Sequence, residues 1–216
     1  MVAPAHIRIG AKALADTSIN SDFRIYKIVY LFGCIAPDIN FVYPLHNIVC
    51  TPKRFQKRII RMKKIKSKII RSFTLGVIMH YICDYFCIAH NNQSYGARHT
   101  LYERIMSRKL GKRALELGWN EEKLGECWKL AVDTFETGEI DFFDILVETK
   151  YTISNDIFKV VKQMNNIYLE KVSNLAKSNW YTDEWQMNFD ISWALFMCEK
   201  VSLMIYGEDM TRLCSV

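Results

Sequence analysis

The longest apolar-rich stretch of the sequence reads FTLGVIMHYICDYFCIAH over residues 73–90. Because its apolar residues leave no broad polar face, it predicts a helix that is buried on nearly all sides and runs through the centre of the fold. His80 and Asp84 in the middle of the stretch argue against a membrane span. The two side chains are four residues apart and therefore project from one face of the helix, one turn apart. This is the spacing that two ligands of one metal ion need.

The rest of the chain also has a helical pattern. Four Pro and nine Gly in 216 residues are few for a sandwich or barrel with many tight turns, and no segment has the alternation of a strand. Apolar residues at helical spacing predict further helices over 7–15, 23–33, 53–71, 98–117, 121–136, 140–149, 152–177 and 183–206. We therefore expect an all-α, single-domain multi-helix bundle over residues 1–216, with a central metal-ligand helix. The expected metal-ligand half spans 5–104, and the expected helical C-terminal half spans 120–207.

The predicted helix boundaries place several polar side chains. Gly33 and Pro37 are expected to end the second helix just before Asp38. Ser72 or Thr74 is the expected cap of the central helix, which then continues to the histidine at position 90. At about 100° per residue, that histidine would lie roughly 80° around the helix from the one at position 80, close enough to bind a neighbouring ion.

Histidine is concentrated in the first half of the chain. All five histidines lie within the first 99 residues, at positions 6, 46, 80, 90 and 99. His99 and Glu103 repeat the His-x3-acid spacing on a second predicted helix, beyond a polar turn. Burying unpaired ionisable groups costs several kcal/mol each. A bound metal ion would offset that cost for all of them together, so the pattern favours a metal centre over a hydrogen-bonded core pair.

Four longer motifs surround these residues. They are AHIRIG over 5–10, GCIAPDIN over 33–40, GVIMHYICDYFCIAHN over 76–91 and HTLYE over 99–103. Together they resemble the zinc-dependent phospholipase C family and its relatives, the fungal zinc-dependent nucleases. The resemblance covers roughly the first half of the chain.

The resemblance implies two or three Zn²⁺ ions and their ligands. The first ion would be held by Asp38, His46, His80 and Asp84, the second by His90, His99 and Glu103, and the third by His6 and Asp84. In the family an N-terminal tryptophan completes the third site, whereas this chain begins Met1-Val2. The resemblance also implies that Asp38 orients or deprotonates the attacking water. Glu103, where the nuclease branch has Asp, resembles the phospholipase branch more closely.

The charge of this ligand set favours an anionic substrate. Two zinc ions and three carboxylates leave a net charge of about +1, and a third ion would leave about +3. Zinc also lowers the pKa of water and binds phosphoryl oxygens. We therefore expect a zinc-dependent phosphodiester hydrolase of phospholipase C type, acting on a phospholipid or another phosphodiester. A nuclease or small-nucleotide phosphodiesterase on the same scaffold, and a non-catalytic zinc-stabilised protein that binds a membrane surface, stay open as alternatives.

A basic run gives the chain its net charge of +6. Residues 53–71 hold ten Lys and Arg and no acid. A helix with such a face can dock on an anionic membrane surface or on nucleic acid, or it can simply be solvated. Few aromatic residues lie in the run, which disfavours base stacking. Seven scattered cysteines and the absence of a signal-peptide pattern lead us to expect a cytoplasmic protein, peripheral to membranes if the basic run docks there.

Overall fold

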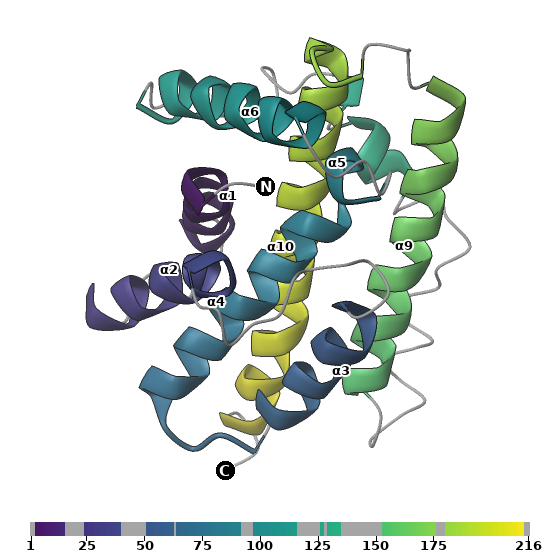
Figure 1. The fold of residues 1–216 in the computed structure, drawn as a ribbon. Coiled ribbons are helices and arrows are strands. Elements are labelled where there is room, and N and C mark those ends of the chain that lie inside the picture. Colours follow the sequence, from purple (N-terminus) through teal and green to yellow (C-terminus); the bar gives the residue numbers. More distant parts are fainter. Residues whose placement is uncertain are drawn as a thin grey trace.

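The structure of the protein is a computed structural model that describes residues 3–15, 24–39, 51–62, 64–91, 97–115, 126–127, 129–134, 153–175 and 180–213. Within these ranges the regular structure is entirely helical, and the helices pack as one bundle, which confirms the predicted all-α class (Figure 1). The helices are α1 (Ala3–Ala15), α2 (Arg24–Ile39), α3 (Thr51–Met62), α4 (Lys68–Tyr85), α5 (Ile88–Asn91), α6 (Ala97–Leu115), α9 (Ile153–Leu175) and α10 (Glu184–Leu213). None of these helices is long and apolar enough to cross a membrane.

Helix α4 forms the centre of the bundle, as the sequence predicts. Every residue from Thr74 to Tyr85 is buried. Helices α1, α2, α3 and α10 all pack against α4, and α9 packs against α3 and α10 (Figure 1). The predicted helices 152–177 and 183–206 correspond to α9 and α10, the second of which continues to Leu213. Residues 126–127 and 129–134 are helical within the predicted helix 121–136, whereas the predicted helix 140–149 lies outside the described residues.

Helices α2 and α4 touch each other through their backbones at two glycines. A Cβ atom on Gly33 would collide with the carbonyl oxygen of Phe73, and one on Gly76 would collide with the carbonyl oxygen of Tyr30. Only glycine allows so close a crossing, because every other residue carries a Cβ. The crossing places the C-terminal turn of α2, with Asp38, against the middle of α4.

The central helix differs from the prediction at both ends. Its cap is Ser67, whose side chain accepts a hydrogen bond from the backbone of Ile70, and the predicted caps at 72 and 74 lie inside the helix. It ends at Tyr85 and does not continue to His90, which lies on the separate helix α5. The physical reason is that the backbone N–H of Ile88 donates to the carboxylate of Asp190 at 2.8 Å, and not to a carbonyl one turn earlier.

Two other predicted boundaries are also wrong. The basic run 53–71 is not one helix, because α3 ends at Met62 and α4 begins at Lys68 after its own cap. Ile59 and Met62 on α3 are buried, whereas Ile69 on α4 is exposed, so the apolar residues of the run do not form one buried stripe. Helix α2 continues through Pro37 to Ile39, so Asp38 lies in its last turn and not beyond it. Pro37 is buried in this turn.

Candidate metal centre

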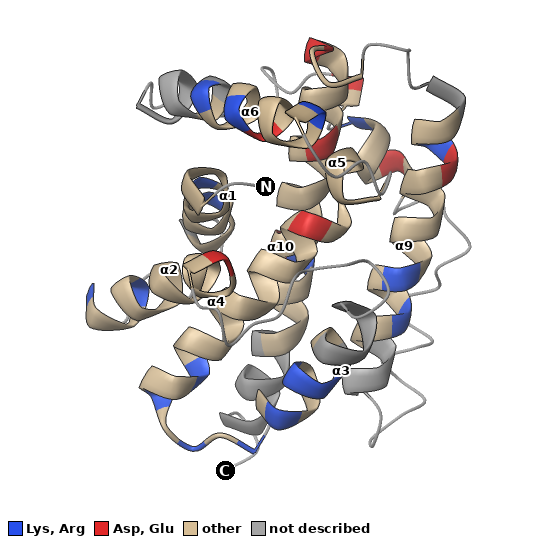
Figure 2. Ribbon diagram, viewed as in Figure 1, with Lys and Arg blue, Asp and Glu red and all other residues tan. Residues whose placement is uncertain are grey.

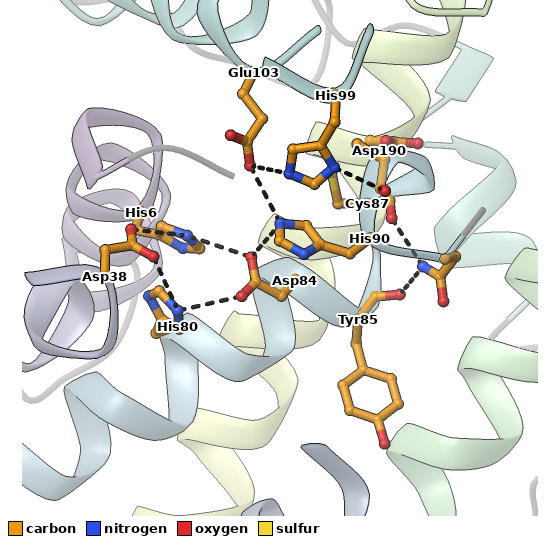
Figure 3. Close-up of polar contacts among 12 residues, drawn as sticks. His6, Asp38, His80, Asp84, Tyr85, Cys87, His90, His99, Glu103 and Asp190 are labelled. Atoms are coloured by element: carbon orange, nitrogen blue, oxygen red, sulfur yellow. Dashed lines mark hydrogen bonds and ion pairs between the residues drawn. The ribbon is translucent and has the colours of Figure 1, made fainter. Parts of the chain in front are cut away.

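Three helices bring the first group of candidate ligands together. His6 comes from α1, Asp38 from α2, and His80 and Asp84 from α4 (Figure 3). The Nε2 atom of His80 lies 3.2 Å from Oδ2 of Asp84 and 3.7 Å from Oδ1 of Asp38. The Nε2 atom of His6 lies 3.4 Å from Oδ1 of Asp84 and 3.7 Å from Oδ2 of Asp38. One ligand atom from each of His6, Asp38 and His80 lies within 4.8 Å of the others, which is a spacing that one ion can bridge.

The second group comes from the two helices that follow α4. His90 lies on α5, and His99 and Glu103 lie one turn apart on α6. The Nε2 atoms of both histidines lie 3.2 Å from Oε1 of Glu103, and the three ligand atoms lie within 4.8 Å of one another.

Asp84 joins the two groups into one centre. Its Oδ1 atom lies 3.2 Å from Nε2 of His90 in the second group and 3.4 Å from Nε2 of His6 in the first (Figure 3). A carboxylate has two oxygens and about four lone-pair directions, so it can serve two ions at once. The arrangement therefore suits a multinuclear centre with Asp84 as its bridge.

Backbone carbonyls set the orientation of two histidines. Nδ1 of His80 donates to the carbonyl oxygen of Cys34 at 2.9 Å, and Nδ1 of His99 donates to that of Ala89 at 3.0 Å. A carbonyl oxygen only accepts, so Nδ1 carries a proton, and in the neutral ring the lone pair of Nε2 then faces the carboxylates. This is the tautomer and the second hydrogen bond that metal-binding histidines have.

The electrostatics of the centre also suit a cation. Burial lowers the pKa of His80 to about 4, with a further contribution from His6, and so keeps the His80 ring neutral. Burial alone would raise the pKa of Asp84, but its interactions with the surrounding imidazoles, that of His90 first, outweigh burial and hold this pKa well below its usual range. Burial alone would lower the pKa of His6, but Asp84 raises it to about 10. The carboxylates therefore attract positive charge, which a metal ion supplies more strongly than a proton.

The candidate ligands differ in their exposure to solvent. His6 and His80 have no exposed side-chain surface, whereas the side chain of Asp38 is 25% exposed. His90, His99 and Glu103 are each partly exposed. Asp38 is thus the candidate ligand that incoming water and substrate reach most easily.

Comparison with known proteins places this centre in a family. A family model described as zinc-dependent phospholipase C matches residues 5–153, a range that includes every candidate ligand. The chain belongs to the zinc-dependent phospholipase C family. This confirms the resemblance seen in the motifs, and it makes the protein a member of a family of phosphodiester hydrolases. No curated protein and no solved structure matches the chain.

The structure brings seven of the eight predicted ligands of this zinc-dependent phospholipase C family member into one centre. They are His6, Asp38, His80, Asp84, His90, His99 and Glu103. The eighth, His46, lies outside the described residues. The rings of His6 and His80 stack with centroids 3.9 Å apart, and His6 lies near Asp38 as well as Asp84. The assignment of His6 to a separate third ion stays a prediction.

The motifs do not point to Asp190, a buried carboxylate on α10 that lies beside the second group (Figure 3). It accepts four hydrogen bonds: from the backbone N–H of Ile88 (2.8 Å), from the hydroxyls of Tyr102 (2.6 Å) and Tyr168 (2.7 Å), and from Nε2 of Gln186 (2.7 Å). Ile88 lies two residues before His90, and Tyr102 directly precedes Glu103. Asp190 thus fixes both α5 and α6. The sequence marks Asp190 in one way, as an acidic residue among apolar residues of the predicted helix 183–206.

Proposed function

We propose that the protein is a multinuclear zinc-dependent phosphodiester hydrolase that cleaves phospholipids in the manner of a phospholipase C. The observation that carries the proposal is the shared carboxylate of Asp84, which lies within 3.4 Å of histidines of both groups. Membership of the family supports zinc as the metal. The donor set supports it too, since neutral imidazole and carboxylate are ordinary zinc ligands.

The proposed ligands would hold two zinc ions, one in each group, and a third ion beside the first group. Asp38, His80 and Asp84 would hold one ion, together with His46 as the resemblance implies, and His90, His99 and Glu103 would hold a second. His6 and Asp84 would hold a third ion, so that the protein contains two or three zinc ions. When bound, zinc supplies Lewis acidity toward water and toward the phosphoryl oxygens.

Asp38 is the proposed catalytic residue. Its carboxylate is the most exposed in the centre, and its two oxygens face His6 and His80. A carboxylate in this place can orient a water molecule for attack on phosphorus and accept its proton. The nearly buried Asp84 has a different proposed role, which is to stay ionised and to bind metal on both sides.

We also propose a cytoplasmic location for the protein. The five cysteines that the structure describes are buried free thiols, which is typical of a reducing compartment.

The test combines zinc content with product analysis on the untagged protein. We expect two or three zinc ions per chain by mass spectrometry, and release of phosphocholine from short-chain phosphatidylcholine. Asp38→Asn is expected to lower turnover by a factor on the order of 10²–10⁴ while the helical circular dichroism is retained. Asp133→Asn is the matched control. It makes the same change at an exposed acid in the helical residues 129–134, which carry none of the candidate ligands, and it should keep full activity.

Three outcomes would contradict the proposal. Release of nucleotides from RNA or DNA without release of phosphocholine would favour the nuclease alternative. Tightly bound zinc without turnover of any phosphodiester would favour a non-catalytic zinc-stabilised protein. Less than about half an equivalent of zinc in the folded protein would mean that the family fold is kept here without its chemistry.

A further inference from the structure

An exposed apolar stripe runs along α2. Ile25, Ile28, Phe32 and Ile39 each expose between 53% and 66% of their surface. At about 100° per residue they fall within an arc of roughly 60° on the helix. Single exposed apolar residues are ordinary on a protein surface, whereas a contiguous row of large ones marks a surface that contacts something.

The stripe continues onto the first turns of α4. Ile69 and Ile70 expose 47% and 55% of their surface. The rings of Phe32 and Phe73 lie 6.1 Å apart where the two helices cross. Ile69 lies one turn before Phe73, and Ile28 lies one turn before Phe32, so the two rows meet at this ring pair. We refer to Ile25, Ile28, Phe32, Ile39, Ile69 and Ile70 as the apolar face.

Exposed basic residues lie on the same elements as the apolar face, and Figure 2 shows the basic positions of α2 and of the start of α4 in blue. They are Arg24 and Lys27 on α2, Lys64 and Lys66 in the connection before α4, and Lys68 in its first turn. Across α2, α3, the connection and α4 as far as the residue before Asp84, the one acid is Asp38. Large apolar side chains within a rim of lysine and arginine are what a protein needs to insert shallowly among anionic headgroups.

We propose that the apolar face docks on an anionic phospholipid bilayer, with α2 lying in the plane of the interface. The stripe ends at Ile39, next to Asp38, so a docked bilayer would border the exposed edge of the metal centre. The sequence alone suggests that the basic run 53–71 can dock on an anionic membrane surface. In the present proposal only the end of that run, from Lys64 to Lys68, contributes its charges, and α2 contributes most of the inserted apolar surface. The docking itself does not depend on the proposed function, but its use to reach substrate does.

The test measures sedimentation of the full zinc-loaded chain with vesicles that it cannot hydrolyse. Vesicles of a digalactosyl lipid, with or without an added anionic sulfolipid, contain no phosphodiester. We expect binding to the anionic vesicles, weaker binding at high salt, and weak binding to the neutral ones. The double variant Ile28→Ser/Phe32→Ser should bind at least about tenfold more weakly, since it loses two inserted apolar side chains.

Matched controls separate docking from unfolding and from catalysis. Leu203→Ser removes a similarly exposed apolar residue from α10 and should bind like wild type. Lys66→Gln/Lys68→Gln should weaken binding, whereas Lys129→Gln/Lys162→Gln should not. Hydrolysis of monomeric short-chain phosphatidylcholine should be unchanged in every variant. Vesicle binding without that hydrolysis would overturn the proposed function and leave the docking intact.

Two results would overturn the docking proposal. One is equal vesicle binding by wild type and Ile28→Ser/Phe32→Ser, or equal losses in that variant and in Leu203→Ser. The other is light scattering that shows a dimer for wild type and a monomer for Ile28→Ser/Phe32→Ser, because the face would then bind a second copy of the chain.

Discussion

Removal of one hydroxyl from the cluster around Asp190 should loosen the second group of candidate ligands. In Tyr102→Phe the ring stays and the 2.6 Å hydrogen bond to Oδ2 of Asp190 is lost. A buried hydrogen bond to a charged group contributes about 1.5–3 kcal/mol. We therefore expect the free energy of unfolding to fall by about 2 kcal/mol. Because Tyr102 directly precedes Glu103, we also expect zinc to bind about tenfold more weakly, as when other supporting contacts of metal ligands are removed.

Tyr168→Phe is the matched control for this prediction. Its hydroxyl is also buried and donates to the same carboxylate, at 2.7 Å, but it lies on α9, which carries none of the candidate ligands. Its loss should lower the free energy of unfolding by a similar amount and change zinc affinity by less than about twofold.

The assay needs two measurements on each variant: guanidinium unfolding of the zinc-loaded protein, and zinc titration against a competing chelator at neutral pH. If Tyr102→Phe and Tyr168→Phe weaken zinc binding equally, Asp190 acts only on the stability of the whole fold. If neither variant changes stability, the four hydrogen bonds to Asp190 do not contribute as we reason.

Three other predictions follow from the fold and the site. Gly76→Ala should lower the free energy of unfolding by about 3 kcal/mol or more, because the new methyl group collides with the Tyr30 carbonyl of α2. Gly10→Ala should be milder, since its nearest neighbour, 2.7 Å away, is the Cys34 side chain; equal denaturation midpoints for the two variants would contradict this. Burial raises the pKa of Asp190 from 3.8 to about 6, so the unfolded chain ionises first and the wild type should lose stability as the pH rises. The measured quantity is the free energy of unfolding of the wild type minus that of Asp190→Asn. This difference should fall by at most about 3 kcal/mol between about pH 4 and pH 6 and should then stay constant. A difference that does not change with pH would refute the prediction. Removal of zinc with EDTA should lower the melting temperature and added zinc should restore it, whereas an unchanged melting temperature would mean that the centre binds no metal in the folded protein.

Local spacing predicted those parts of the centre that lie on one helix. His80 and Asp84, like His99 and Glu103, are four residues apart, and a helix alone brings such pairs together. His6 and Asp38 come from other helices, and only the family resemblance connected them with the centre before the structure did. Spacing misplaced His90, since it took α4 and α5 for one continuous helix.

Asp190 shows why the rest could not be predicted from spacing. Its partners Ile88 and Tyr102 are 102 and 88 residues away along the chain. Helical spacing alone brings Gln186 to Asp190, four residues later on α10, but no local pattern adds the donors from α6, α9 and the start of α5. The interrupted central helix has the same origin, because its break depends on the N–H of Ile88 finding a distant carboxylate.

The backbone contact at Gly33 and Gly76 makes the angle between α2 and α4 a determinant of the geometry of the candidate ligands. Asp38 lies five residues beyond Gly33, about 7.5 Å along the helix axis at 1.5 Å per residue. Distances between a metal and its ligands tolerate errors of about 0.2 Å, which corresponds to a rotation of only about 2° over that length. With no side chain at the pivot that could change rotamer, the two glycines leave little freedom for such a rotation. The contact between Gly33 and Gly76 therefore determines how precisely the Asp38 carboxylate is placed against α4. That contact itself contains neither a candidate ligand nor a charged group.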